Sequence, residues 1–67
     1  MLPYGPVTVV CDQYGTPSRE AYQELPGVIL GASINNGVIR YAVRIDYPGD
    51  NWVITGVEDE SLLSPLH

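Results

Sequence analysis

The sequence of 67 residues predicts an all-β fold in which five short strands form a small barrel. Three observations support this prediction. Short runs rich in β-branched residues recur along the chain, and turn residues separate them. The run at 38–46 alternates between apolar and polar positions, which indicates a strand with one buried face and one wet face. The first two runs are joined by a long polar segment, which we expect to be a loop or a single helical turn.

The first strand is expected at 7–12, "VTVVCD", because this run is β-branched and prolines precede it. One face of this strand would carry Val7, Val9 and Cys11. The segment 13–26, "QYGTPSREAYQELP", is the longest polar stretch of the chain. Ser18 could cap one helical turn there, and Pro26 would end it.

A hairpin is expected at 27–46, with strands at 27–34 and 38–46. Its turn is Asn-Asn-Gly, and an Asn-Gly pair accepts the positive φ angles of a type I′ turn. In the first strand one face would carry Val28, Leu30, Ala32 and Ile34, and the other Ile29, Gly31 and Ser33. In the second strand the buried face would carry Ile39, Tyr41, Val43 and Ile45, and the wet face Val38, Arg40, Ala42 and Arg44. A glycine inside a strand, here Gly31, suggests a bulge or a sharp bend that lets a small sheet curl.

A proline-glycine turn at 47–50 leads to a fourth strand at 51–57, "NWVITGV". The polar segment that follows contains "SLL", which can pair as a short closing strand before Pro65. Five strands with a long first connection match an SH3-like small barrel, and we expect residues 1–67 to form one such domain.

The pattern "PGVILGA…RYAVRID…W.I…VEDESL" resembles the plasmid-borne type II dihydrofolate reductases. The shared order consists of Gly27, Ile29, Gly31, Tyr41, Ala42, Val43, Pro48, Gly49, Ser61 and Leu62. The resemblance covers about the C-terminal 40 residues and implies an SH3-like barrel. It also implies a tetramer that binds folate and a nicotinamide cofactor in a central pore, through a Val-Gln-Ile-Tyr stretch and a nearby lysine. Here the corresponding positions 52–55 read Trp-Val-Ile-Thr and the chain has no lysine, so the resemblance implies the fold more than the activity.

The composition limits the kinds of partner. Eight acidic residues stand against three arginines, and the net charge of −5 disfavours a surface that tracks nucleic-acid phosphates. No apolar run approaches the length of a membrane span, and the N-terminus lacks the basic region of a signal peptide, so we expect no membrane partner and a cytoplasmic setting. A chain this short buries a small core, and oligomerisation is its most available stabiliser, because Cys11 is the only cysteine.

No motif for catalysis or cofactor binding is present, and we expect no cofactor and no metal site. His67, the only histidine, is the last residue, so Cys11 is better interpreted as a small buried hydrophobe than as a nucleophile. Asp46 and Asp50 flank a turn, where carboxylates usually bond backbone N–H groups. The acidic run at 58–60 is either a solvated turn or a surface for a basic partner.

Four aromatic residues are candidates for binding: Tyr14, Tyr22, Tyr47 and Trp52. Tyrosine and tryptophan combine a large contact area with a polar group and are enriched in interfaces. In an SH3-like barrel the long first loop and the turn at 47–50 can lie near each other, which would gather all four. In the alternative interpretation Trp52 belongs to the core and the tyrosines cover its edges. Arg40 and Arg44 lie on the wet face, where they either pair with acids on a neighbouring strand or bind an anion or an acidic partner.

Three functions are compatible with these features. The first is a small acidic, non-enzymatic interaction module that self-associates or binds another protein. The second is a ligand-binding or reductase-like oligomer with a small-molecule site between barrels. The third is an antitoxin or inhibitor that presents its acids to a basic partner, an association that would be sensitive to salt.

Overall fold

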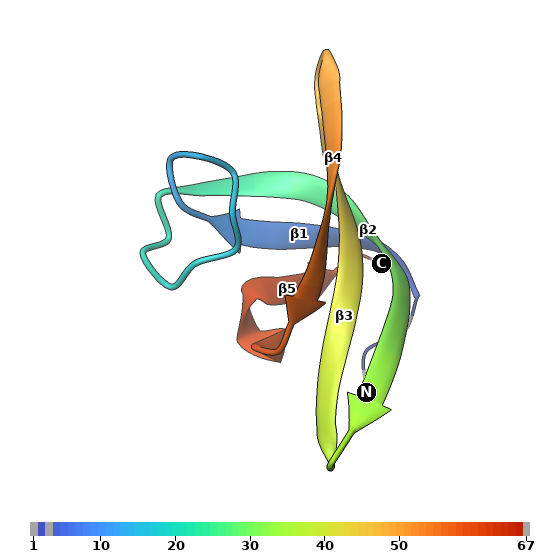
Figure 1. The fold of residues 1–67 in the computed structure, drawn as a ribbon. Helices are drawn as coiled ribbons and strands as arrows, with labels where there is room; N and C mark the ends of the chain where they lie inside the picture. Colours follow the sequence, from blue (N-terminus) through green and yellow to red (C-terminus); the bar gives the residue numbers. More distant parts are fainter. Residues whose placement is uncertain (1, 3, 67) are drawn as a thin grey trace.

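The computed structural model describes residues 2 and 4–66 of the chain and has an all-β architecture (Figure 1). Five antiparallel strands form one sheet in the order β4-β3-β2-β1-β5. The elements are β1 (Gly5–Cys11), β2 (Gln23–Asn35), β3 (Val38–Tyr47), β4 (Asp50–Val57), the 3-10 turn η1 (Glu60–Leu62) and β5 (Leu63–Pro65). Within this described part, no helix is long and apolar enough to cross a membrane.

The long strand β2 gives the sheet its curl, because it pairs with β1 along its first half and with β3 along its second. Figure 1 shows β2 and β3 bending across the molecule, so that β1 and β5 face the β3–β4 hairpin. The five-stranded SH3-like small barrel predicted from the sequence is confirmed. The first connection is a loop, and the helical turn of the fold lies between β4 and β5 instead.

Short side-chain bonds explain why residues 12–22, here called the long loop, do not form a helix. Asp12 Oδ1 accepts hydrogen bonds from the backbone N–H groups of Tyr14 and Thr16, and Ser18 Oγ accepts one from Glu20 N–H. Such bonds satisfy the backbone locally and compete with helical pairing. An isolated bridge between Cys11 and Pro17 then holds the loop against the end of β1.

The predicted start of β2 was too late, because Pro26 was expected to stop a preceding loop or helical turn. The strand begins at Gln23, and Pro26 pairs with Thr8 of β1. Pairing with β3 begins only at Gly27, so the segment 23–26 is an edge of the sheet on its other side. Proline is tolerated at such an edge, where its missing N–H group has no partner to lose.

The core lies on the concave side of the sheet and follows the alternation of the sequence. All buried apolar residues of the described chain are Val7, Val9, Cys11, Leu25, Ile29, Tyr41, Val43, Ile45, Val57, Leu62 and Leu63. The predicted inward faces of β1 and β3 are confirmed. Asn36 and Gly37 have φ angles of 52° and 79°, which confirms the type I′ turn between β2 and β3.

The face assignment in β2 was wrong for part of the strand. A β-bulge lies between Ile29 and Gly31, as the glycine suggested. Leu30 is the extra residue, so the alternation changes face there. Ile29 therefore points into the core and Leu30 outward, whereas Ala32 packs against the core further along the strand.

Candidate functional site

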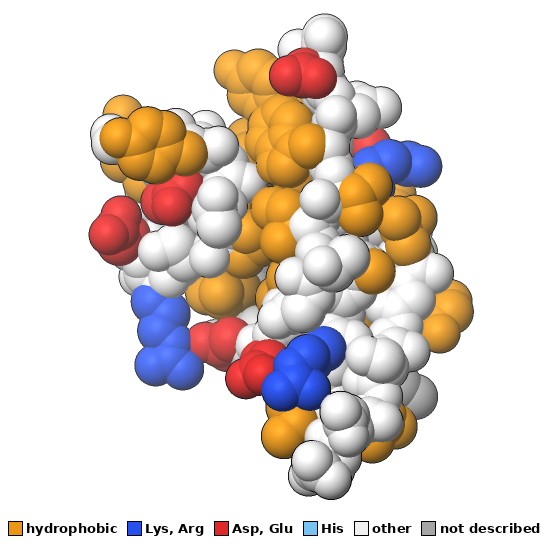
Figure 2. Space-filling model, viewed as in Figure 1, with side chains coloured by type: hydrophobic (Ala, Val, Ile, Leu, Met, Phe, Trp, Pro, Cys, Tyr) orange, Lys and Arg blue, Asp and Glu red, His pale blue; other side chains and the backbone are white. Residues whose placement is uncertain are grey.

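Three of the four candidate aromatic residues meet at one end of the barrel. Tyr14 lies on the long loop, Tyr47 ends β3, and Trp52 is the third residue of β4. All three line the same groove, which also runs past the Pro48–Gly49 turn and has a volume of about 550 Å³. In Figure 2 hydrophobic side chains form a column down the hollow beside the long loop.

Trp52 is the fixed centre of this group. Its partner in β3 is Ile45, a core residue, so the indole lies on the concave side and is half-buried. The indole Nε1–H donates a hydrogen bond to the carbonyl oxygen of Gly15, at 3.1 Å. The Tyr47 ring lies 6.2 Å from the indole, centroid to centroid, with the planes tilted by 37°. Such tilted aromatic pairs are favourable, and this one holds the indole from a second side.

Gly15 is required by this contact with the indole. It has a φ of +84°, and a Cβ atom there would lie 2.5 Å from Trp52 Cζ2. Glycine meets both conditions, since it takes positive φ freely and leaves room for the ring. The long loop and β4 are therefore joined by one hydrogen bond and one close packing contact.

Tyr14 is the most exposed of the three aromatic residues in the groove, with 80 % of its surface accessible. Tyr22 is also exposed but lies outside the groove. It directly precedes Gln23, whose side-chain amide donates a hydrogen bond to the Asp12 carbonyl and lines a separate hollow beside Tyr14 and Trp52.

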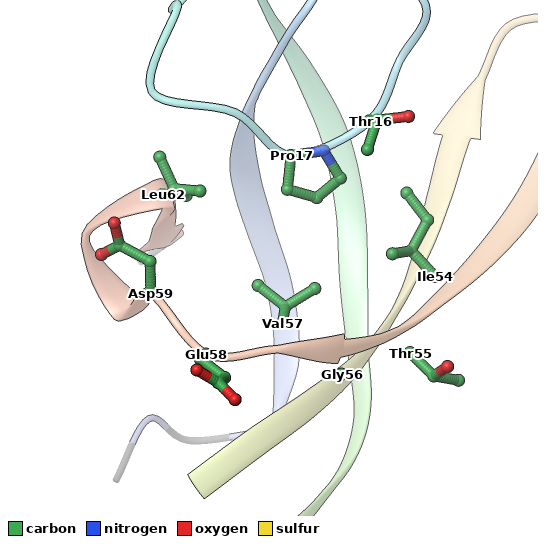
Figure 3. A pocket seen from close by; sticks show the side chains of 9 residues that line it. All are labelled: Thr16, Pro17, Ile54, Thr55, Gly56, Val57, Glu58, Asp59 and Leu62. Carbon is green, nitrogen blue, oxygen red and sulfur yellow. The ribbon is translucent and has the colours of Figure 1, made fainter. Parts of the chain in front are cut away.

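The groove continues along β4 through a second hollow of about 380 Å³ (Figure 3). Thr16 and Ile54 line both parts, and the second part is floored by apolar side chains. Figure 3 shows Pro17, Ile54, Val57 and Leu62 around this space, with Asp59 at its rim. We call the whole depression, from Tyr14 to Leu62, the loop–β4 groove.

Sequence reasoning missed this second half of the groove. The one available signal was the alternation of β4, which puts Ile54 on the same face as Trp52. The positions of Pro17 and Leu62 depend on contacts between segments distant in the chain, namely the Cys11–Pro17 bridge and the turn η1.

The two arginines proposed for binding lie away from the aromatic residues of the groove, and each forms a salt bridge with a carboxylate. Arg40 Nε lies 2.9 Å from Glu58 Oε1, and Arg44 Nε lies 2.7 Å from Asp46 Oδ1. The hydrogen bond from Arg44 lowers the pKa of Asp46 and raises that of Arg44. Both arginines thus pair with acids, but Asp46 lies on the same strand as Arg44 and not on a neighbouring strand as expected. A role in binding an anion stays a prediction.

The electrostatic character of the surface is negative. Arg19 pairs with Asp59 at 2.7 Å, so each of the three arginines has a carboxylate partner. Within residues 2 and 4–66, the acids outside salt bridges are Asp12, Glu20, Glu24, Asp50 and Glu60. Asp50 lines the aromatic end of the groove, and Glu20 lies on the long loop.

Cys11 has no access to the groove. The thiol is fully buried, and burial, followed by the charge of Asp12, raises its pKa to about 11. It stays protonated near neutral pH, where a reactive cysteine would be a thiolate. His67, considered as its base, lies outside the described residues. Over residues 2 and 4–66, no three histidine, cysteine, aspartate or glutamate side chains gather where they could hold a metal ion.

Comparison with family models, curated proteins and solved structures finds no match to this chain. The resemblance to the type II dihydrofolate reductases therefore stays a prediction, and the function must be inferred from the groove itself.

Proposed function

We propose that this chain is a small, acidic protein-interaction module that binds an extended segment of a partner protein in the loop–β4 groove. One observation carries the proposal: Tyr14, Tyr47 and Trp52 converge on one groove, with the indole held in place by Gly15. Rigid aromatic residues in a concave surface supply most of the affinity in many interfaces.

The charge of the surface supports a basic partner. The arginines are already paired with carboxylates, whereas Asp50, which lines the groove, and Glu20 on the long loop are not. A segment that combines apolar side chains with arginine or lysine would fill the groove and meet these acids. Because these acids are exposed, they should mainly affect the association rate and its dependence on salt.

Binding can be read from the fluorescence of Trp52, the only tryptophan of the chain. The probe is a short synthetic peptide of arginine, proline and leucine, and its control contains glutamate in place of arginine. We expect saturable binding of the first peptide that weakens with added salt, and none of the second. No binding of the arginine peptide would overturn the proposal.

Two tyrosine variants locate the site. Tyr14→Ala removes an exposed groove residue, and Tyr22→Ala removes an exposed tyrosine outside the groove. We expect Tyr14→Ala to weaken peptide binding by at least about tenfold, since an aromatic anchor typically contributes more than 1.4 kcal/mol. Tyr22→Ala should bind as the unmodified chain does. Equal affinities of the two variants would contradict the assignment of the groove.

A further inference from the structure

The two edges of the sheet differ sharply. At one edge β5 has three residues and ends in Pro65, so it offers little for another strand to pair with. At the other edge β4 has eight residues, pairs only with β3, and contains no proline, lysine or arginine. Natural proteins usually protect a long edge strand by such residues. Up to the bulge at Thr55–Gly56, the β4 edge is therefore open to pairing with another strand.

The register of the β3–β4 hairpin shows which backbone groups face outward. The Pro48–Gly49 turn closes on the pair Tyr47–Asp50, and hydrogen-bonded pairs then alternate along the strands. The backbone N–H and C=O groups that point away from β3 thus belong to Asn51, Val53 and Thr55. Among the described residues, no hydrogen bond outside the sheet uses these groups.

We propose that two copies of this chain form a dimer by antiparallel pairing of their β4 edges about a twofold axis at Val53. In this register residues 51–55 of one copy pair with the same five residues of the other copy, in reverse order. Asn51 of one copy faces Thr55 of the other, Val53 faces Val53, and Trp52 faces Ile54. Each cross-strand pair is polar with polar or apolar with apolar, which stabilises a sheet.

The bulge and the position of Asp50 select this register over its neighbours. With the axis at Val53, Asp50 of one copy faces Gly56 of the other, so no like charges meet. A shift of the axis to Ile54 would require Gly56 and Val57 to pair, beyond the bulge at Thr55–Gly56. A shift to Trp52 would place Asp50 against Ile54, which buries a charge against an apolar residue. The bulge at Thr55–Gly56, where Gly56 has a φ of +75°, then ends the paired segment.

Apolar exposure on both faces of β4 also fits a second copy. Val53 is 57 % exposed on the outer face, and Trp52 and Ile54 are half-buried on the concave face. Pairing would cover all three and extend the sheet to ten strands. The paired segment is short compared with standard interfaces, so we expect a reversible dimer that forms as the concentration rises.

The test is the mass of the full chain by light scattering over a concentration series up to high micromolar. We expect the mass to rise from one chain to two. Val53→Lys places like charges opposite each other on the axis and should keep the chain monomeric. Leu30→Lys makes the same change of charge at a residue 45 % exposed on the outer side of β2, and should dimerise as the unmodified chain does. A monomer at all concentrations, or a dimer of Val53→Lys, would overturn the proposal.

Hydrogen exchange identifies the strand. The amides of Asn51, Val53 and Thr55 should exchange more slowly as the dimer forms, because only pairing of this edge satisfies them. A doubling of mass without this protection would mean that another surface forms the dimer. The two proposals can be tested by separate residues: Val53 does not line the groove, and Tyr14 does not lie on β4. Tyr14→Ala should therefore still dimerise, so the two proposals can fail separately.

Discussion

Replacing Gly15 by alanine tests whether the long loop and β4 are held together as described. The residue has a φ of +84°, and left-handed backbone costs other residues about 1–2 kcal/mol. The new Cβ would also lie 2.5 Å from Trp52 Cζ2 and 3.3 Å from two further ring atoms, so the indole must move. That movement would break its hydrogen bond to the Gly15 carbonyl, with a net value of about 0.5–1.5 kcal/mol.

Gly15→Ala should therefore lower the free energy of unfolding by about 1.5–3.5 kcal/mol, the range of the two contributions together. Gly37→Ala is the matched control, because Gly37 has a φ of +79° and open space where its Cβ would lie. It should cost only about 1–2 kcal/mol. Urea unfolding measures both values, and the emission of Trp52 should change only in Gly15→Ala. Equal costs with unchanged emission would refute the contact between the loop and β4.

Three further predictions concern single groups. Cys11 is buried and has its pKa raised to about 11, so a thiol reagent should label it at neutral pH only as fast as the chain unfolds; rapid labelling of the folded chain would contradict this. Hydrogen bonds from Ser61 and then Arg19 lower the pKa of Asp59 from 3.8 to about 2. The ionised Asp59 carboxylate therefore stabilises the fold above pH 4, and this contribution is lost as the pH falls towards about 2. In an acid titration, Asp59→Asn should consequently lose less stability than the unmodified chain. Tyr41→Phe should lower the free energy of unfolding by about 0.5–1.5 kcal/mol in thermal denaturation, because its buried hydroxyl accepts a backbone hydrogen bond at 2.9 Å.

Local patterns were sufficient for the central hairpin. The Asn-Asn-Gly turn and the alternation at 38–46 depend on neighbouring residues alone, and both the turn and the faces of β3 agree with the structure. Gly31 indicated a bulge, but the sequence did not show that Leu30 would be the extra residue. Whether Ile29 or Leu30 points inward is decided by pairing with β3, which the sequence does not display.

The site required information about distant contacts. The topology was sufficient to predict that three aromatic residues meet, because the long first loop and the β3–β4 turn share one end of the barrel. These residues are Tyr14, Tyr47 and Trp52. The rest of the groove could not be predicted in this way, because the position of Pro17 depends on its bridge to Cys11. Pro26 led to a predicted start of β2 that is too late, because proline usually breaks a strand. It is tolerated here because this part of β2 has β1 as its only neighbour and is therefore an edge.

The groove and the dimer edge meet at two residues, and this has a testable consequence. Trp52 and Ile54 line the loop–β4 groove, and in the dimer they pack against the second copy. One surface cannot be covered twice, so a bound segment and a second copy should exclude each other. By linkage, the arginine peptide should shift the dimer towards monomers, and it should bind more tightly at low protein concentration.

The matched measurement uses Val53→Lys, which is expected to be monomeric and to keep its groove. Its peptide affinity should not depend on protein concentration, whereas that of the unmodified chain should fall as dimer forms. If saturating peptide left the dimer mass unchanged, the two surfaces would be separate. The barrel would then present two independent surfaces, with the unprotected β4 edge serving assembly alone.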